Sequence, residues 1–367
     1  MKKRVKRTFS IHHWCGLVAG IFILVISLSG SILVFDDEID DAVFSKQSTL
    51  AEPAQTLHID NSYEWVRQQN PGWEIRIPAL PASKTEALQY ELRQGQLRRW
   101  IFVHPDTGKE LATIKQAHNR FTYVVLNIHY NLLSGTPGKV VVLLVGISLL
   151  LLTITGFMLY RKSIIKVLSF RQKISTKSKR SFYSSMHRLV GVWSLAFNLF
   201  MCITGLSLAI TVLNSALKST DAEIGTPALS FSVDAAMAEA RTAYPDFNIT
   251  YLRFPKAEGG PLLFIGRHQS DPAYYGKFYS NIQLNTGTGK IEKSDFLKDK
   301  SLLDRVLVIL HPLHFGDFAG LLLQLVYCIG GLMPGILSIS GFVIWYYRDQ
   351  ASLSATKSAK IKLKHTT

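Results

Sequence analysis

The chain has 367 residues, of which 47% are hydrophobic and 18% are charged, and its formal net charge at pH 7 is +15. The basic excess is confined to three short segments, and no basic-plus-aromatic RNA or DNA motif is present, so nucleic acid is not an expected partner. All three cysteines lie in apolar runs, which excludes a disulfide scaffold and a cysteine-ligated zinc or iron–sulfur site.

Four runs without Asp, Glu, Lys or Arg are long enough to cross a bilayer, which takes about 20 residues of helix. These runs are Trp14–Phe35, Val140–Tyr160, Leu189–Leu217 and Phe318–Tyr347. Basic residues precede the first run as in a cleaved signal peptide, but the run is long for one and no A-x-A-like site follows. We therefore expect an α-helical membrane protein with four transmembrane helices.

The charge distribution predicts the orientation of these helices. Residues 1–10, 161–188 and 348–367 carry 5, 9 and 5 Lys or Arg residues, and Asp349 is their one acidic residue. Because basic residues concentrate on the cytoplasmic side of short loops, both termini and the middle loop should be cytoplasmic. The chain should therefore divide into two similar halves. The first half consists of the N-terminus with helix 1 (1–35), an outward domain with an outer interfacial segment (36–138), and helix 2 (139–160). A cytoplasmic loop (161–186) leads to helix 3 (187–217), the second outward domain with its interfacial segment (218–317), helix 4 (318–347) and the cytoplasmic tail (348–367).

The two halves of the chain repeat one pattern of histidine and glycine. His12 precedes Gly30 by 18 residues, and His187 precedes Gly205 by 18. Likewise, 27 residues separate His129 from Gly156 and His314 from Gly341. Both halves enter the membrane from the cytoplasm, so we predict a tandem duplication whose halves share one topology.

Each outward loop begins with a helical pattern that passes through a turn into a strand. The first reads "YEWVRQQNPGWEIRIPAL" and the second "SVDAAMAEARTAYPDFNITYLRF". Alternating strands follow, and each loop has a glycine turn, "HPDTGKEL" or "LNTGTGKIE". The pattern predicts two small α+β domains, each with a helix packed on an antiparallel sheet.

Helix, strands and this turn occur twice between four helices that bear "HHWCGL", "IHYNLLSG", "MHRLVGV" and "LHFGDFAG". Over about residues 8–348 this combination resembles the PepSY-associated transmembrane family. Its members are bacterial inner-membrane proteins, often linked to iron uptake, and some resemble ferric-siderophore reductases that bind b-type haem between the helices. The resemblance implies two periplasmic PepSY-like domains and, as the substrate, a ferric siderophore or other ferric chelate. The family's first motif usually reads L-H-R-W, and here His13 replaces the arginine.

Four of the eleven histidines recur at matched positions, and ionisable groups in membrane segments tend to mark functional sites. His12 and His187 each begin a helix on the cytoplasmic side, whereas His129 and His314 each precede a helix on the outer side. Eighteen residues of helix rise about 27 Å. His12 can therefore share an iron with His187, and His129 with His314, but the two levels cannot share one.

Two imidazoles on opposite faces of a flat macrocycle are the ligation expected of an electron-transfer haem, and helix bundles commonly hold such cofactors. We therefore expect two b-type haems in an oxidoreductase that reduces the ferric chelate. Because the chain has no nucleotide-binding motif, its electrons should come from quinol or a separate reductase. His13 and His311 are weaker candidate ligands, since His13 points about 100° away from His12 on a helix.

Three alternatives stay open. His311 and His314 share a helical face and could form a three-histidine zinc site with His129. The outward domains could instead form a cofactor-free binding or regulatory module, or the helices could belong to a siderophore or iron transporter. The remaining histidines lie in polar stretches and are expected to be ordinary surface or loop residues: His58, His104, His118, His268 and His365.

Overall fold

The computed structural model describes residues 3–218 and 225–364, which fall into two compact units. The helical unit comprises residues 1–34, 125–217 and 320–367, and the sheet unit comprises residues 35–124 and 218–319. Three boundaries between the units lie within two residues of those predicted, whereas the boundary at 124/125 lies 14 residues before the predicted start of helix 2.

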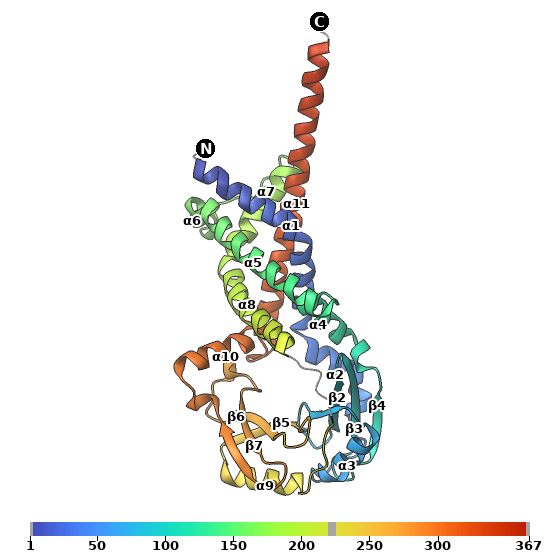
Figure 1. The fold of residues 1–367 in the computed structure, drawn as a ribbon. Coiled ribbons are helices and arrows are strands. Elements are labelled where there is room, and N and C mark those ends of the chain that lie inside the picture. Colours follow the sequence, from blue (N-terminus) through green and yellow to red (C-terminus); the bar gives the residue numbers. More distant parts are fainter. Residues whose placement is uncertain (1–2, 219–224, 365–367) are drawn as a thin grey trace. The chain divides into compact units, whose positions relative to one another are not determined.

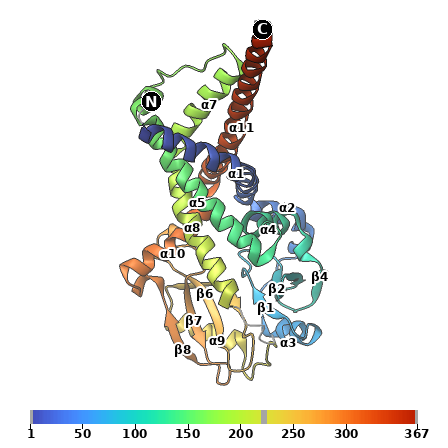
Figure 2. The ribbon, with the colours of Figure 1, turned by 45° about the horizontal axis from the view of Figure 1, so that its top comes forward.

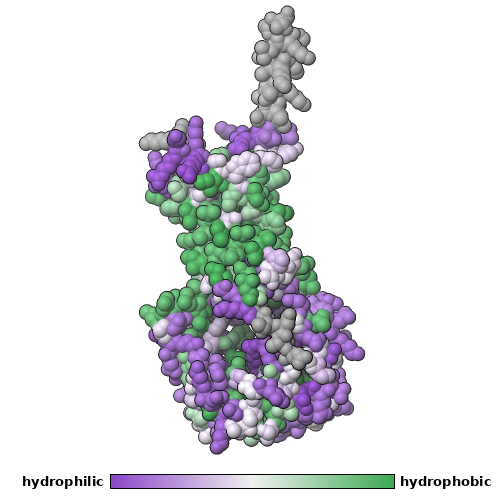
Figure 3. Space-filling model, in the orientation of Figure 1, coloured by the Kyte–Doolittle hydropathy of each residue, from purple (hydrophilic) through white to green (hydrophobic). Residues whose placement is uncertain are grey.

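The helical unit contains, among the described residues, four helices long and apolar enough to span a membrane. They are α1 (Lys3–Leu33), α5 (Gly135–Tyr160), α8 (Leu195–Lys218) and α11 (Gly320–Lys364). Large apolar side chains on these helices are exposed, and Figure 3 shows the apolar surface that they form. Such a surface needs lipid around it, so the prediction of a multi-pass membrane protein is confirmed.

Shorter helices complete this unit: α4 (Phe121–Asn131), which begins in the sheet unit, the 3₁₀ turn η2 (Arg161–Ser163), α6 (Ile164–Leu168) and α7 (Lys179–Trp193). The predicted third transmembrane helix is therefore two helices, α7 and α8, that meet at Ser194. Two hydrogen bonds from Asn198 hold this junction. Its side chain donates to the Ser194 hydroxyl at 3.0 Å, and its backbone N–H donates to the Ser194 carbonyl at 2.7 Å.

Helices α1 and α11 pack closely where small residues face each other. The Ser27 hydroxyl donates to the Gly331 carbonyl and accepts from the Gly335 backbone N–H at 3.0 Å. Pro334, between them in sequence, has no N–H to donate and disturbs the helix at this point. A hydroxyl from the neighbouring helix thus satisfies backbone groups that would otherwise be exposed to hydrocarbon.

The sheet unit is built on an antiparallel sheet of eight strands in the order β4-β3-β2-β1-β5-β6-β7-β8 (Figure 1). Its first four strands are β1 (Glu74–Ile77), β2 (Leu88–Gln94), β3 (Leu97–Val103) and β4 (Glu110–Ile114). The other four are β5 (Phe247–Arg253), β6 (Leu262–His268), β7 (Ser280–Leu284) and β8 (Ile291–Asp295). Each loop thus supplies four strands in chain order, as its alternating pattern predicted, and β1 pairs with β5 to join them into one sheet.

Helices α3 (Asp60–Gln69) and α9 (Val233–Ala243) cover one face of this sheet (Figures 1 and 2). Both helices and both sets of strands contribute to one hydrophobic core, in which Ile75, Leu252 and Phe264 are fully buried. The predicted helix on a sheet is present in each half, but the two halves share a core. Other elements of this unit are α2 (Asp36–Ser48), η1 (Ala117–Asn119), η3 (Ala273–Tyr275), η4 (Leu297–Asp299) and α10 (Leu302–Phe315).

The two covering helices cap each other reciprocally. The Asp60 carboxylate accepts the backbone N–H of Val233 at 2.8 Å and the hydroxyl of Ser232, which is itself the N-cap of α9. The Asp234 carboxylate accepts the N–H groups of Ile59 at 2.9 Å and Asp60 at 3.3 Å. Each carboxylate therefore satisfies N–H donors at the start of the other helix, where the helix dipole favours negative charge.

Removing one of these carboxylates should destabilise the sheet unit. Asp60→Ala leaves donors at the start of α9 without their acceptor, and the expected loss of unfolding free energy is about 1–2 kcal/mol. Chemical denaturation of the purified protein, followed by tryptophan fluorescence, measures it. The matched control is Asp246→Ala, because this exposed carboxylate makes no side-chain hydrogen bond in the described structure. Equal stability of both variants would contradict reciprocal capping.

Candidate functional site

Two of the predicted histidines lie side by side in the helical unit. His12 is on α1 and His187 is on α7, and their ring centres are 6.3 Å apart with the ring planes at 89°. The chain separates these residues by 175 positions, so the helix packing alone brings them together. The structure thus places together the pair that the repeat predicted for the inner side of the membrane.

A hydroxyl fixes the same nitrogen in each ring. Nδ1 of His12 lies 2.9 Å from Thr155 Oγ1 on α5, and Nδ1 of His187 lies 2.9 Å from Ser340 Oγ on α11. Each hydroxyl already donates its one proton to a carbonyl of its own helix, that of Leu151 or Leu337. When each hydroxyl keeps this bond to its own helix, the imidazole donates from Nδ1, which leaves the lone pair on Nε2. This is the neutral tautomer that can bind a metal through Nε2.

Glycines in both halves allow the rings to lie against the helices. A Cβ at Gly156 would lie 3.4 Å from Cε1 of His12, and one at Gly341 would lie 3.5 Å from Cε1 of His187. In the same way, a Cβ at Gly16 would meet Leu152, and one at Gly191 would meet Leu337. Gly156 and Gly341, which the sequence placed in register, thus border the two imidazoles in matched positions, and Gly16 and Gly191 border a matched pair of leucines.

Both rings line a mainly apolar cavity of about 380 Å³ between the helices. Its wall is formed chiefly by glycine, leucine and aromatic side chains, which include Leu17, Leu149, Leu195, Phe342 and Trp345. A concave apolar site with a few convergent polar groups is typical of cofactor pockets. Two imidazoles that line such a space fit a planar cofactor whose metal takes two nitrogen ligands.

His13 borders the same cavity but points elsewhere. Its Nε2 accepts a hydrogen bond from the Arg348 guanidinium at 2.9 Å, and its ring stacks on Phe9. A nitrogen lone pair that accepts from arginine is not available to a metal. The geometry therefore favours His12 over His13, as the register with His187 did.

His129 lies near the other end of α1, where it packs against the helix. Its Nδ1 lies 3.0 Å from the Ile26 carbonyl and 3.2 Å from Ser29 Oγ. A Cβ at Gly30 would lie only 2.7 Å from Cε1 of this ring, so glycine is required there. Because a carbonyl can only accept, Nδ1 of His129 carries the proton, as in the inner pair.

His311 and His314 are on α10 of the sheet unit. The ring of His311 lies 6.1 Å from that of Tyr279, and burial lowers the pKa of His311. Burial and Asp317 together raise the pKa of Tyr279 to about 12. Since His129 and His314 belong to different units, their pairing stays a prediction. Among the described residues, no group of three or more His, Cys, Asp or Glu residues is arranged to hold a metal ion, so the zinc alternative gains no support.

The remaining histidines have local contacts. His58 lies 3.7 Å from Asp234, Nδ1 of His104 accepts the Asp106 N–H, and His118 lies beside Arg98. His268 lies buried in β6 against Phe296, so the expectation that it is a surface or loop residue is wrong, and His365 lies outside the described residues. Thr155 and Ser340 were missed by the sequence analysis, although each directly precedes a repeated glycine, in "TITG" and "SISG".

Comparison with known proteins agrees with the resemblance seen in the sequence. The chain is 25% identical over 260 residues to an uncharacterized protein of Pseudomonas aeruginosa, and the match covers 63% of this chain and 65% of that relative. The model of the PepSY-associated TM region matches residues 9–348. This match extends over nearly the whole chain, and the protein therefore belongs to the PepSY-associated transmembrane family.

Proposed function

We propose that this protein is a haem-binding oxidoreductase of the bacterial inner membrane that reduces a ferric chelate, such as a ferric siderophore, on the periplasmic side. The observation that carries this proposal is the His12–His187 pair in its apolar cavity. Two imidazoles bound to one metal at about 2 Å have ring centres about 6 Å apart. The separation in the structure is 6.3 Å.

The residues around this pair would hold and tune a b-type haem. A haem iron supplies one-electron redox chemistry when it is bound. Thr155 and Ser340 keep the lone pair of each imidazole on Nε2 and orient the ring. Gly156 and Gly341 leave the space that lets each ring approach its hydroxyl. The mainly apolar wall of the cavity would lower the polarity around the haem, and that polarity is one determinant of a haem potential.

We propose a second haem site formed by His129 and His314, with His311 as its alternate ligand. His129 has the same protonated Nδ1 as the inner pair. It packs at Gly30 of α1, 18 residues beyond His12, a rise of about 27 Å along the helix. Two sites at these depths would lie near opposite faces of the membrane. Quinol or a separate reductase would then supply electrons at the inner site.

The matched hydroxyl–histidine–glycine contacts support a tandem duplication in which each half contributes one ligand to each site. The basic segments support cytoplasmic termini and a periplasmic location for both outward domains, each of which we interpret as PepSY-like. Neither a cofactor-free binding module nor an iron transporter would require these matched histidine contacts, so we favour the haem-binding oxidoreductase over both.

The purified protein should be red, with the visible spectrum of six-coordinate b-type haem that sharpens on reduction with dithionite. His12→Ala and His187→Ala should each remove the inner haem, whereas His13→Ala should retain it because His13 bonds to Arg348. The haem-to-protein ratio and the spectra of oxidised and reduced forms measure this. A colourless preparation from haem-replete cells would overturn the proposal.

The outer pair is tested separately. His129→Ala and His314→Ala should each lower the haem content by about half while the inner site keeps its spectrum. If His314 is the ligand, His311→Ala should leave the haem content unchanged. Loss of haem in the His311 variant, with none in the His314 variant, would assign the ligand to His311 instead.

The hydroxyls give a finer test of the inner site. Thr155→Val keeps the side-chain shape but removes the acceptor for Nδ1–H, so His12 becomes a less basic ligand. Loss of such a second partner commonly costs about 10–100-fold in metal affinity. We expect weaker haem retention and a higher midpoint potential of the inner haem, measured by redox titration. Thr211→Val is the matched control, because that hydroxyl bonds only within its own helix. Identical potentials in both variants would contradict the assigned tautomer.

A further inference from the structure

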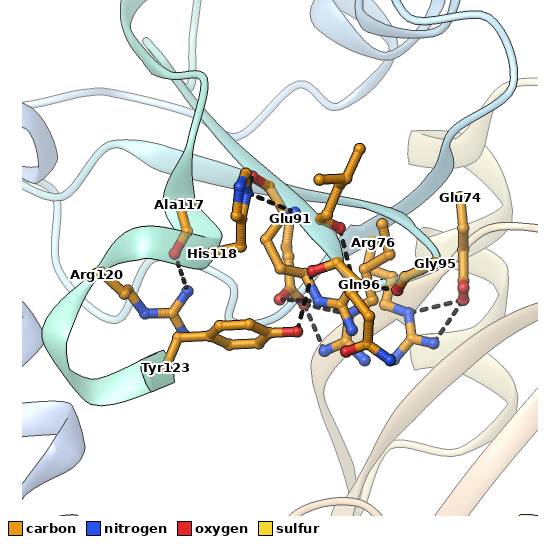
Figure 4. Close-up of polar contacts among 12 residues, drawn as sticks. Glu74, Arg76, Glu91, Gly95, Gln96, Ala117, His118, Arg120 and Tyr123 are labelled. Atoms are coloured by element: carbon orange, nitrogen blue, oxygen red, sulfur yellow. Dashed lines mark hydrogen bonds and ion pairs between the residues drawn. The ribbon is translucent and has the colours of Figure 1, made fainter. Parts of the chain in front are cut away.

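The sheet face opposite α3 and α9 carries an excess of positive charge. Strand register places Glu74, Arg93 and Arg98 in one row across β1, β2 and β3. The next row places Arg253, Arg76 and Glu91 across β5, β1 and β2. Ile75 and Ile77 point into the core beneath the helices, so these charged residues occupy the other face. Figure 4 shows Glu74 paired with Arg76 on this face.

Two buried carboxylates are each held by several cations. Glu74 contacts Arg76 at 2.6 Å, Lys256 at 3.0 Å and Arg253 at 3.2 Å. Glu91 contacts Arg93 at 2.6 Å, and Arg98 lies at 4.0 Å. Five cations therefore surround two carboxylates, which leaves three positive charges uncompensated within this group.

The register makes this arrangement costly unless something compensates it. Arg76 lies directly opposite Arg253, and Arg93 lies directly opposite Arg98. Like charges at directly opposed positions destabilise a sheet. Burial is the main cause of the lowered pKa of Arg98, and Arg93 adds to it. By contrast, burial acts to raise the pKa of Glu74, but Arg76, Lys256 and Arg253 outweigh it and hold that pKa below its usual value. Glu74 is thus already engaged by three cations, while each arginine side chain carries five N–H donors.

Aromatic rings border the cations. Arg76 donates to the Tyr251 hydroxyl at 3.2 Å, and the ring of Phe278 meets that of Tyr251 edge-on at 5.8 Å. Phe278 itself is 53% exposed. On the other side, the guanidinium of Arg98 lies over the ring of Tyr123 at 5.4 Å. Tyr251 and Tyr123 are buried, so Phe278 is the exposed ring of these three. An exposed aromatic ring close to arginines suits an anion that carries its charge on flat rings.

We propose that this basic face binds a small anionic metal chelate whose metal is held by phenolate or catecholate oxygens. Charge complementarity selects an anion, and the aromatic border favours aryl oxygens over aliphatic carboxylates. The cations extend from β3 to β5, three strand intervals or about 14 Å, which is the footprint of a small complex. The redox role of the site depends on the proposed function, but the binding does not.

The site is connected to α10 within the sheet unit. A Cβ at Gly276 would lie 3.1 Å from Pro312, so the segment before β7 packs on α10 between His311 and His314. Two residues further on, Phe278 reaches Tyr251 on the basic face. A chelate bound on this face would therefore be adjacent to the segment that contacts the helix of the proposed outer ligands.

Binding can be measured without reduction by using gallium(III), which resembles iron(III) in charge and size but is not reduced. The probes are a gallium tris-catecholate, with charge −3, and a neutral gallium trihydroxamate, titrated into the full-length protein in detergent. We expect the tris-catecholate to bind at least about tenfold more tightly, and its affinity to fall as salt is raised. Equal affinity for both chelates would overturn the proposal, and a failure to bind haem would leave this result unaffected.

Variants locate the site. Arg253→Gln with Lys256→Gln should weaken tris-catecholate binding about tenfold or more, because both side chains are partly exposed and can donate to the ligand. Glu74→Gln should strengthen it, since a competing carboxylate is removed, whereas a purely structural role would make both changes harmful. Arg241→Gln, an exposed arginine on α9, is the matched control and should have no effect. If the double variant does not fold, Lys256→Gln alone tests the site and should also weaken tris-catecholate binding. Unchanged affinity in the cation variants, or binding to phosphatidylglycerol micelles in place of the chelate, would overturn the assignment.

Discussion

The need to satisfy polar groups inside a hydrocarbon layer explains most of the detail in the helical unit. An imidazole has two nitrogens, and neither can be left without a partner where water is absent. Nδ1 of each inner ring is satisfied by a hydroxyl on the adjacent helix, and that hydroxyl is satisfied in turn by its own backbone. Only Nε2 is left for a ligand, and the chain brings two such nitrogens to one apolar cavity. The same constraint explains why Ser27 bonds to α11 beside Pro334.

In the sheet unit the corresponding constraint is the small size of each half. Four short strands and one helix bury little apolar surface alone, so a single half would be marginally stable. Pairing β1 with β5 removes two exposed edges and merges the two cores. Asp60 and Asp234 then tie each covering helix to the other half. Stability of either half therefore depends on the other, which sequence patterns within one loop do not reveal.

The sequence predicted those features of the structure that follow from the periodicity of apolar residues and from the register of the repeat. The apolar runs predicted the four spans, and equal spacings of 18 and 27 residues predicted that His12 should meet His187. It could not predict the break at Ser194, because this residue lies inside an apolar run that contains neither a charged residue nor a proline. Nor could it predict the single sheet, since β1 and β5 are 170 residues apart and their pairing depends on tertiary packing. Thr155 and Ser340 were overlooked because hydroxyls in membrane helices usually bond within their own helix.

The basic face shows why charge counted along the chain is a poor guide to a site. The outward loops contain more acidic than basic residues, so composition suggests no attraction for anions. Strand register nevertheless gathers arginines from β1, β2, β3 and β5 on one face and leaves most acidic residues elsewhere. A fold that only needed stability would separate Arg76 from Arg253 and Arg93 from Arg98. Glu74 and Glu91 each lie beside both members of one opposed pair and relieve part of this repulsion. The anion that we propose would relieve the rest, so part of the cost to the free sheet would become a gain in affinity when the ligand binds.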